Sequence, residues 1–227
     1  MRNSKYGKFL TVLLIIAIIA IVGLLIFFGI DMYQKYYLDS QAEKVLEQFE
    51  GSLVTGNEEE NNNNTTTNTQ NTTDNPFSEL EDVNFAGGGS SSNVVMYEDY
   101  IVLGRIEIPK TGRDYPILHK VTTRSLEIAV ATIYSPGINE VGNTVIMGHN
   151  YRNGTLFSNN KMLELGDKIY ITDNTGRRIS YTIYNKYETD ENDASYMTRD
   201  TQGKREISLS TCTDEGNKRL IIWARED

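Results

Sequence analysis

The sequence has a single cysteine and only two histidines among its 227 residues. One cysteine excludes an internal disulfide bond and any zinc or iron–sulfur site that needs several thiolates. Two histidines argue against a metal site built from imidazoles alone. Positive charge is also short, because 22 lysines and arginines stand against 31 acidic residues, which leaves a net charge of −9. This balance argues against a nucleic-acid partner, which a basic surface usually marks.

Charge and apolarity are unevenly spread along the chain. Residues 1–8 carry basic residues and no acidic one, and residues 9–30 carry no charge and are rich in isoleucine and leucine. As a helix, residues 9–30 would rise about 33 Å, enough to cross a hydrocarbon layer of about 30 Å. A cleaved signal peptide would have a shorter apolar stretch and a small-residue cleavage site. We therefore predict a basic cytoplasmic head at 1–8 and a transmembrane anchor at 9–30, with the rest of the chain outside the cell.

The segments after the anchor differ in what they can bury. Residues 31–56 have few helix breakers and apolar residues at helical spacing, which predicts a helical stalk that continues the anchor. Residues 57–93 are rich in asparagine and threonine and then in glycine and serine. That composition predicts a disordered linker. The folded domain is therefore expected at 94–227, which is close to neutral and long enough to form a core.

Short strands dominate the pattern of the expected domain. The predicted strands are 101–108, 114–118, 143–147, 168–173, 177–187, 206–211 and 218–225. Residues 123–134 instead place apolar residues on one helical face after a threonine cap, and they predict a helix. Many short strands with few helices indicate an antiparallel barrel or sandwich.

Cys212 lies at the end of the predicted strand 206–211, on the side of the strand that carries two serines and a glutamate. A lone cysteine is often a small core residue. The polar face and the strand-end position favour a reactive thiol instead, because an exposed thiol outside the cell is open to oxidation. The residues alone leave both interpretations open.

His149 follows the predicted strand 143–147 and opens a polar loop. Scaffolds commonly display catalytic groups at such positions, and an imidazole there could serve a thiol as acid and base. A structural loop histidine is the alternative. His119 is interpreted as a surface or strand-end residue.

Arg219 opens the last predicted strand, a short turn after Cys212. If the last two strands pair as a hairpin, the guanidinium lies near the thiol, where it could favour a thiolate and stabilise an oxyanion. The strand carries other cations, so a plain surface arginine is the alternative.

Together these pieces resemble the sortase family. The segment LSTC at 209–212, followed by a turn and Arg219, is similar to the family's TLxTC-type strand end and the arginine that opens its next strand. The segment NTVIMGHNYRNG resembles the histidine region of the family and places its catalytic histidine at His149. The resemblance runs from about Val94 to Ala224, with Ser208 as a mild departure from the threonine of TLxTC.

The resemblance implies a mainly β fold, a sortase-like closed eight-stranded barrel with one or two short helices, and the activity of a cysteine transpeptidase. Cys212 would attack the Thr–Gly bond of an LPxTG-like sorting signal. His149 would protonate the leaving amine, and Arg219 would hold the substrate and stabilise the oxyanion. An amine of the peptidoglycan precursor would then accept the acyl group. This chemistry needs no metal and no cofactor, and we predict none.

The implied partners are surface proteins that bear sorting signals, the peptidoglycan precursor and, through the anchor, the membrane, but no nucleic acid. The implied location is the cell membrane of a Gram-positive type envelope. The candidate pocket walls are Thr211, Tyr196, Met197 and Trp223, with ordinary barrel packing as the alternative for each. Acidic residues between 188 and 193 are interpreted as a solvated loop, and we predict no calcium site.

Within the family the sequence resembles class A or D. Pilus-type sortases usually carry a lid with an Asp-Pro-aromatic motif and a C-terminal membrane helix; here residues 74–77 only echo the lid, and no second span is expected. Class B sortases have a long helical insertion for which 188–203 is too short. A pilus-type sortase and a non-catalytic surface β-domain remain the alternatives. A papain-like hydrolase is disfavoured, because its cysteine usually precedes its histidine.

Overall fold

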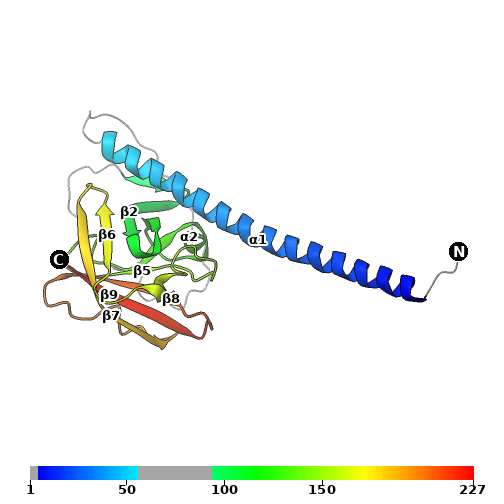
Figure 1. The fold of residues 1–227 in the computed structure, drawn as a ribbon. Coiled ribbons are helices and arrows are strands. Elements are labelled where there is room, and N and C mark those ends of the chain that lie inside the picture. The colour runs from blue at the N-terminus through cyan, green and yellow to red at the C-terminus, as the bar shows by residue number, and fades with distance from the viewer. Residues whose placement is uncertain (1–4, 56–93) are drawn as a thin grey trace.

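The computed structural model describes residues 5–55 and 94–227, so the predicted linker at 57–93 and half of the basic head lie outside the described residues. The first element is one continuous helix, α1 (Lys5–Thr55), which contains both the predicted anchor and the predicted stalk. Its first half extends away from the rest of the molecule (Figure 1). By length and composition, α1 is a candidate to cross a membrane.

The remaining elements build one sheet that closes on itself. The strands are β1 (Val95–Tyr97), β2 (Tyr100–Ile108), β3 (Arg113–Leu118), β4 (Val130–Tyr134), β5 (Gly142–Met147), β6 (Lys168–Asp173), β7 (Arg178–Asp190), β8 (Arg205–Cys212) and β9 (Lys218–Glu226). Their order is β1-β2-β3-β4-β5-β8-β9-β7-β6, and β6 also pairs with β2. That pairing closes eight strands into a barrel, which confirms the expected fold, and β1 is an additional strand beside β2.

The helices of this part are short. They are α2 (Thr123–Ile128) and the 3₁₀ turns η2 (Pro109–Thr111) and η3 (Asn160–Met162). The helix predicted over 123–134 is wrong in its second half, which forms β4. Thr122 and Ser125 close a capping box at its start, but Ala129 has φ −157° and ψ −156°, which is extended backbone. The β-branched residues that follow favour a strand, and β3 and β5 on either side supply its partners.

The expectation of an antiparallel sheet is also wrong for two pairs. β3 and β4 run parallel, and so do β5 and β8. Parallel neighbours need a crossover connection. In the first pair α2 lies in the connection, and in the second the β6–β7 hairpin is inserted. Such partners are not joined by a tight turn, so strand periodicity does not reveal them. The other predicted strands are confirmed to within a few residues.

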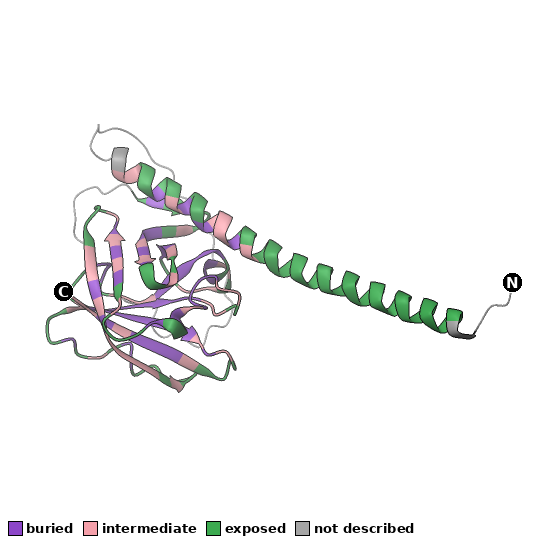
Figure 2. Ribbon diagram, in the orientation of Figure 1, coloured by how far each residue is buried: buried purple, intermediate pink, exposed green. Residues whose placement is uncertain are grey.

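The second half of α1 is packed on the barrel, as the buried segments in Figure 2 show. Leu38, Ala42, Val45 and Phe49 are buried. Their spacing places them on one face of the helix. Val45 and Phe49 join a cluster on the outside of the barrel that includes Val95, Val102, Leu118, Leu126, Ile128, Ala129, Ala131 and Met147. Burying each large apolar side chain stabilises the packed state by roughly 1.5–3 kcal/mol. The stalk helix is therefore part of the folded domain.

Candidate active site

The ends of three neighbouring strands bring the predicted catalytic residues to one edge of the barrel. In the parallel pair of β5 and β8, Met147 lies opposite Ser210, and the Gly148 N–H donates to the Ser210 carbonyl at 3.2 Å. Continuing this register by two residues places His149 level with Cys212. In the antiparallel pair of β8 and β9, Cys212 lies opposite Arg219. The cysteine therefore sits between the histidine and the arginine.

A tight turn keeps Cys212 and Arg219 paired. The Thr213 N–H donates to the Lys218 carbonyl at 2.9 Å, and the Gly216 N–H donates to the Thr213 carbonyl at 3.0 Å. Gly216 has φ +75°, a conformation that glycine adopts without the steric cost that a Cβ imposes. The hairpin predicted from the sequence is thus confirmed, and it places the guanidinium on the strand beside the thiol.

The side chain of Asn150 joins the histidine loop to the cysteine strand. Its Nδ2 donates to the Cys212 carbonyl at 3.0 Å and to Asp214 Oδ1 at 2.9 Å. Its Oδ1 accepts from the Arg152 N–H at 3.0 Å. This residue is not among those predicted from the sequence. The available signal was its position directly after His149, in a loop that must lie beside Cys212 once β5 and β8 are neighbours.

The imidazole of His149 is half-buried, and burial lowers its pKa, opposed in part by the negative charge of Glu127. Its ring lies 4.9 Å from the ring of Tyr151, centroid to centroid. Desolvation disfavours a charged imidazole. The neutral form therefore predominates near pH 7, and the imidazolium is a minority.

The Arg219 guanidinium is oriented by the connection between β7 and β8. Its Nε donates to the Glu191 carbonyl at 3.1 Å. Within the described ranges, 5–55 and 94–227, no carboxylate lies within ion-pair distance of Arg219. Its remaining N–H groups therefore have no carboxylate partner. They can donate hydrogen bonds to an oxyanion that develops during the reaction.

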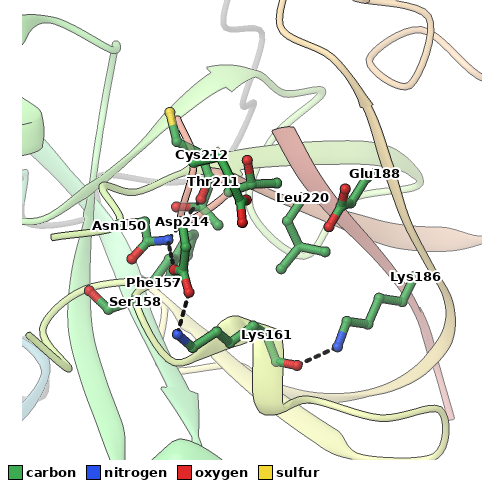
Figure 3. Close-up of a pocket in the computed structure, with 12 residues that line it drawn as sticks. Asn150, Phe157, Ser158, Lys161, Lys186, Glu188, Thr211, Cys212, Asp214 and Leu220 are labelled. Carbon is green, nitrogen blue, oxygen red and sulfur yellow. Dashed lines mark hydrogen bonds and ion pairs between the residues drawn. The ribbon is translucent and has the colours of Figure 1, made fainter. Parts of the chain in front are cut away.

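A pocket of about 260 Å³ adjoins the cysteine (Figure 3). Its lining includes Thr211 and Cys212 from β8, Leu220 from β9, and Phe157 and Ser158 from the loop after β5. Figure 3 shows the sulfur pointing away from the opposite wall, which Lys161 forms together with Lys186. Cys212 thus lines one end of the pocket, which extends toward these lysines, while its sulfur points away from them.

The polar groups around the pocket differ in whether they have hydrogen-bond partners. Lys161 pairs with Asp214 at 2.6 Å, and Lys186 donates to the Lys161 and Leu163 carbonyls at 2.6 and 2.8 Å. The buried hydroxyls of Ser158, Thr211 and Thr213 have no hydrogen-bond partner among the described residues. Three residues of the pocket lining thus carry buried hydroxyls without partners beneath its surface.

The four predicted pocket residues occupy different places. Thr211 lines the pocket. Tyr196 and Met197 are buried in a cluster with Val145 and Ile221. Trp223 packs against that cluster, with the Arg199 guanidinium 4.5 Å from its ring centroid. Of the four, only Thr211 lines the pocket, and the other three pack the outer face of the barrel.

That outer face is covered by the connection between β7 and β8, residues 191–204. Asn143 Nδ2 donates to the Tyr196 and Met197 carbonyls, both at 2.9 Å, and its Oδ1 accepts from Ser208 Oγ at 2.8 Å. The polar side of β8 is therefore buried, although the sequence pattern had suggested an exposed one. Cys212 is only partly buried, because it lies at the edge of this cover.

Beneath this connection, Glu206 of β8 is a buried charged side chain. Burial raises its pKa, but hydrogen bonds from Tyr184, Arg199 and Arg225 outweigh burial and lower the pKa overall. The carboxylate is thus ionised and satisfied, which holds Arg199 and the connection in place. Over the ranges 5–55 and 94–227, no group of three or more histidine, cysteine or acidic side chains is placed to hold a metal ion.

Comparisons with known proteins agree on the kind of domain. Residues 106–227, more than half of the chain, match the family model of the sortase domain. A sortase A of Bacillus anthracis is 34% identical over 130 residues, which cover 53% of this chain and 58% of that protein. The chain therefore matches less than two thirds of the length of this relative.

Two solved structures have the same fold. Sortase A from Corynebacterium diphtheriae is 29% identical with a TM-score of 0.51, over 56% of this chain and 60% of that one. A sortase D5 transpeptidase from Clostridium perfringens is 28% identical with a TM-score of 0.50, over 56% of this chain and 79% of that one.

Proposed function

This chain belongs to the sortase family, and from that premise we propose that it is a cysteine transpeptidase. It cuts an LPxTG-like sorting signal between threonine and glycine and joins the acyl group to an amine of the peptidoglycan precursor. The observation that carries the proposal is the edge where Cys212 lies opposite Arg219 and is bonded, through its carbonyl, by Asn150, the residue after His149. The sortases A of Bacillus anthracis and Corynebacterium diphtheriae and the sortase D5 of Clostridium perfringens share 28–34% of their residues with this chain, which supports a class A- or D-like enzyme.

In the first half-reaction, the Cys212 thiolate attacks the threonine carbonyl carbon of the sorting signal and forms an S–C bond. The carbonyl oxygen becomes an oxyanion, and the Arg219 guanidinium, on the paired position of β9, stabilises it. The C–N bond to glycine then breaks, and His149 gives its proton to the leaving amine. A thioester between Cys212 and the threonine carbonyl remains.

In the second half-reaction, the acceptor amine attacks the thioester carbon, and the new C–N bond replaces the S–C bond. The amine loses a proton to the neutral His149, and Cys212 leaves as a thiolate. The thiolate and imidazolium needed for the next cycle are thereby restored. Because burial lowers the pKa of His149, its imidazolium is a minority form near pH 7.

We place the enzyme at the cell membrane, with α1 crossing the bilayer and the barrel outside. The uncharged apolar run of α1 spans Phe9 to Ile30. The exposed tyrosines Tyr33, Tyr36 and Tyr37 follow within seven residues, as aromatic residues do at a membrane–water interface. The basic residues before Phe9 support a cytoplasmic N-terminus.

The test is transpeptidation by the full chain in detergent micelles. We expect a library of LPxTG-type peptides to yield a cleaved product and, with a glycine peptide added, a ligated product seen by mass spectrometry. Cys212→Ala should lower the rate at least about 1,000-fold, because the covalent step is lost. Cleavage that survives Cys212→Ala would show that another group is the nucleophile. If no peptide in the library reacts, the chain is a non-catalytic surface β-domain.

A further inference from the structure

Helix α1 sets the distance between the membrane and the barrel. Its uncharged apolar run ends at Ile30, directly before Asp31, and its first buried residue on the barrel is Leu38. Eight helical residues rise about 12 Å. The helix is continuous between these points, with no break at which the domain could swing. The barrel therefore begins within about 12 Å of the apolar segment and moves with the helix.

The part of α1 that packs on the barrel runs from Leu38 to Phe49. The end of this docked helix that is nearer the apolar segment lies beside the histidine loop, residues 148–156. Tyr37 interacts with Arg124 of α2, and Glu127 of the same short helix is close enough to His149 to influence its pKa. On the other side, Asp39 lies 3.6 Å from Arg113.

Arg113 belongs to a strand that also holds the histidine loop. Its guanidinium lies against Gly154. Two residues on, the Tyr115 hydroxyl accepts from the Leu156 N–H at 2.8 Å. The loop 148–156 is thus held between α2 and β3, at the level of Tyr37 to Asp39.

The opposite end of the docked helix lies beside a different part of the barrel. Glu50 pairs with Arg105 in the middle of β2. Leu53 reaches Gly176 in the turn between β6 and β7. From Tyr37 to Leu53 the helix rises about 24 Å. Figure 1 shows α1 leaving the barrel on the side away from the C-terminus. At the C-terminus, the Asp227 N–H donates to the Ser180 carbonyl of β7. The histidine loop is therefore nearer the apolar segment than the β6–β7 turn is.

We propose that the histidine loop forms a face of the barrel that lies against the bilayer surface, so that the site acts on groups held close to the lipid headgroups. The inference rests on the membrane-spanning part of the proposed function. Tyr151 and Arg152 are exposed on this loop. An aromatic ring and a guanidinium are suited to contacts with headgroups and anionic lipids.

Site-directed quenching tests the orientation without any catalysis. Cys212 is the only cysteine in the sequence, so Cys212→Ser gives a cysteine-free chain. A fluorophore is attached at Arg152→Cys or, as the matched control, at Thr175→Cys in the β6–β7 turn. The full chain is reconstituted into phosphatidylcholine–phosphatidylglycerol vesicles whose headgroups carry a nitroxide quencher. We expect the probe at 152 to be quenched at least twice as strongly as the probe at 175. Equal quenching, or a stronger effect at 175, would overturn the proposal.

A spacer experiment tests the consequence for the substrate. Seven helix-forming residues inserted between Gln34 and Lys35 add about 10 Å of helix and keep its facing to within about 20°. We expect ligation to a vesicle-anchored amine to fall about tenfold, while ligation to a soluble glycine peptide stays unchanged. An unchanged rate with the anchored amine would contradict the proposal. An inactive parent enzyme would count against the proposed function, and the quenching result would still decide the orientation.

Discussion

A single side-chain amide links the loop that carries His149 to the backbone of the nucleophile. Asn150 lies 62 residues before Cys212, and its Nδ2 donates to the Cys212 carbonyl. An amide can donate where a carboxylate cannot. The same amide also donates to Asp214, whose negative charge would repel a carboxylate at position 150. Beyond the end of the β5–β8 ladder, the histidine loop is therefore bonded to the Cys212 carbonyl and to Asp214 by the donors of this one residue.

Asn150→Asp should lower kcat for cleavage about tenfold, which corresponds to about 1.4 kcal/mol in the barrier. The new carboxylate removes both donors and faces Asp214, so the loop should move away from the cysteine. Steady-state cleavage of a fluorogenic sorting peptide measures it. The matched control is Asn153→Asp in the same loop, which keeps the Oδ1 that accepts from Thr155. Equal activity of the two variants would show that Asn150 does not position the loop.

At the scale of the element, the connection 191–204 matters most, because it orients Arg219 and covers the outer face of β8. It contains little regular structure and is held by side chains of the sheet. Asn143 from β5 donates to two of its carbonyls, and Glu206 from β8 binds Arg199. Buried polar groups of this kind are costly to leave unpaired. The order of the connection therefore depends on a small number of hydrogen bonds.

Asn143→Ala should lower the free energy of unfolding by about 2 kcal/mol, because it leaves the Tyr196 and Met197 carbonyls buried without donors. Urea unfolding of the full chain in detergent, followed by Trp223 fluorescence, measures the change. The control Asn192→Ala lies in the same connection but is exposed and bonds only Asp190, so it should change stability by less than about 0.5 kcal/mol. A similar loss in both variants would argue that Asn143 has no special role.

At the scale of the whole molecule, helix and barrel form one folded unit. The buried stripe of α1 covers a cluster that includes Met147 at the end of β5, two residues before His149. Ala42 also joins the main core together with Tyr115, Leu156 and Phe157, which support the histidine loop. A chain cut at residue 94 would thus lose packing on which the catalytic edge depends.

Phe49→Ala should lower the thermal midpoint of the full chain in detergent by roughly 10 °C, the effect of losing about 3 kcal/mol from a domain of this size. Tyr36→Ala is the control, since that ring lies on the same helix but is 74% exposed. Scanning fluorimetry compares the two. An unchanged midpoint for Phe49→Ala would mean that α1 does not contribute to the folded domain.

Much of this protein can be predicted from local patterns. The alternation around Cys212 places it at a strand end on the face of Ser208 and Ser210, because side-chain parity is a property of each strand. The LSTC segment and Arg219 identify the hairpin, since its two strands are joined by a short turn. The apolar stretch of α1 is equally local. These features need no knowledge of what the strands pair with.

The remaining features depend on contacts between distant parts of the chain. The parallel pairing of β5 with β8 brings His149 to Cys212, and no periodicity within either strand selects that partner. The stripe from Leu38 to Phe49 is visible in the sequence, but the surface that buries it forms only when β1, β2, β3 and α2 assemble. Residues 130–134 become a strand for the same reason, because neighbouring strands satisfy backbone groups that a helix would have satisfied internally.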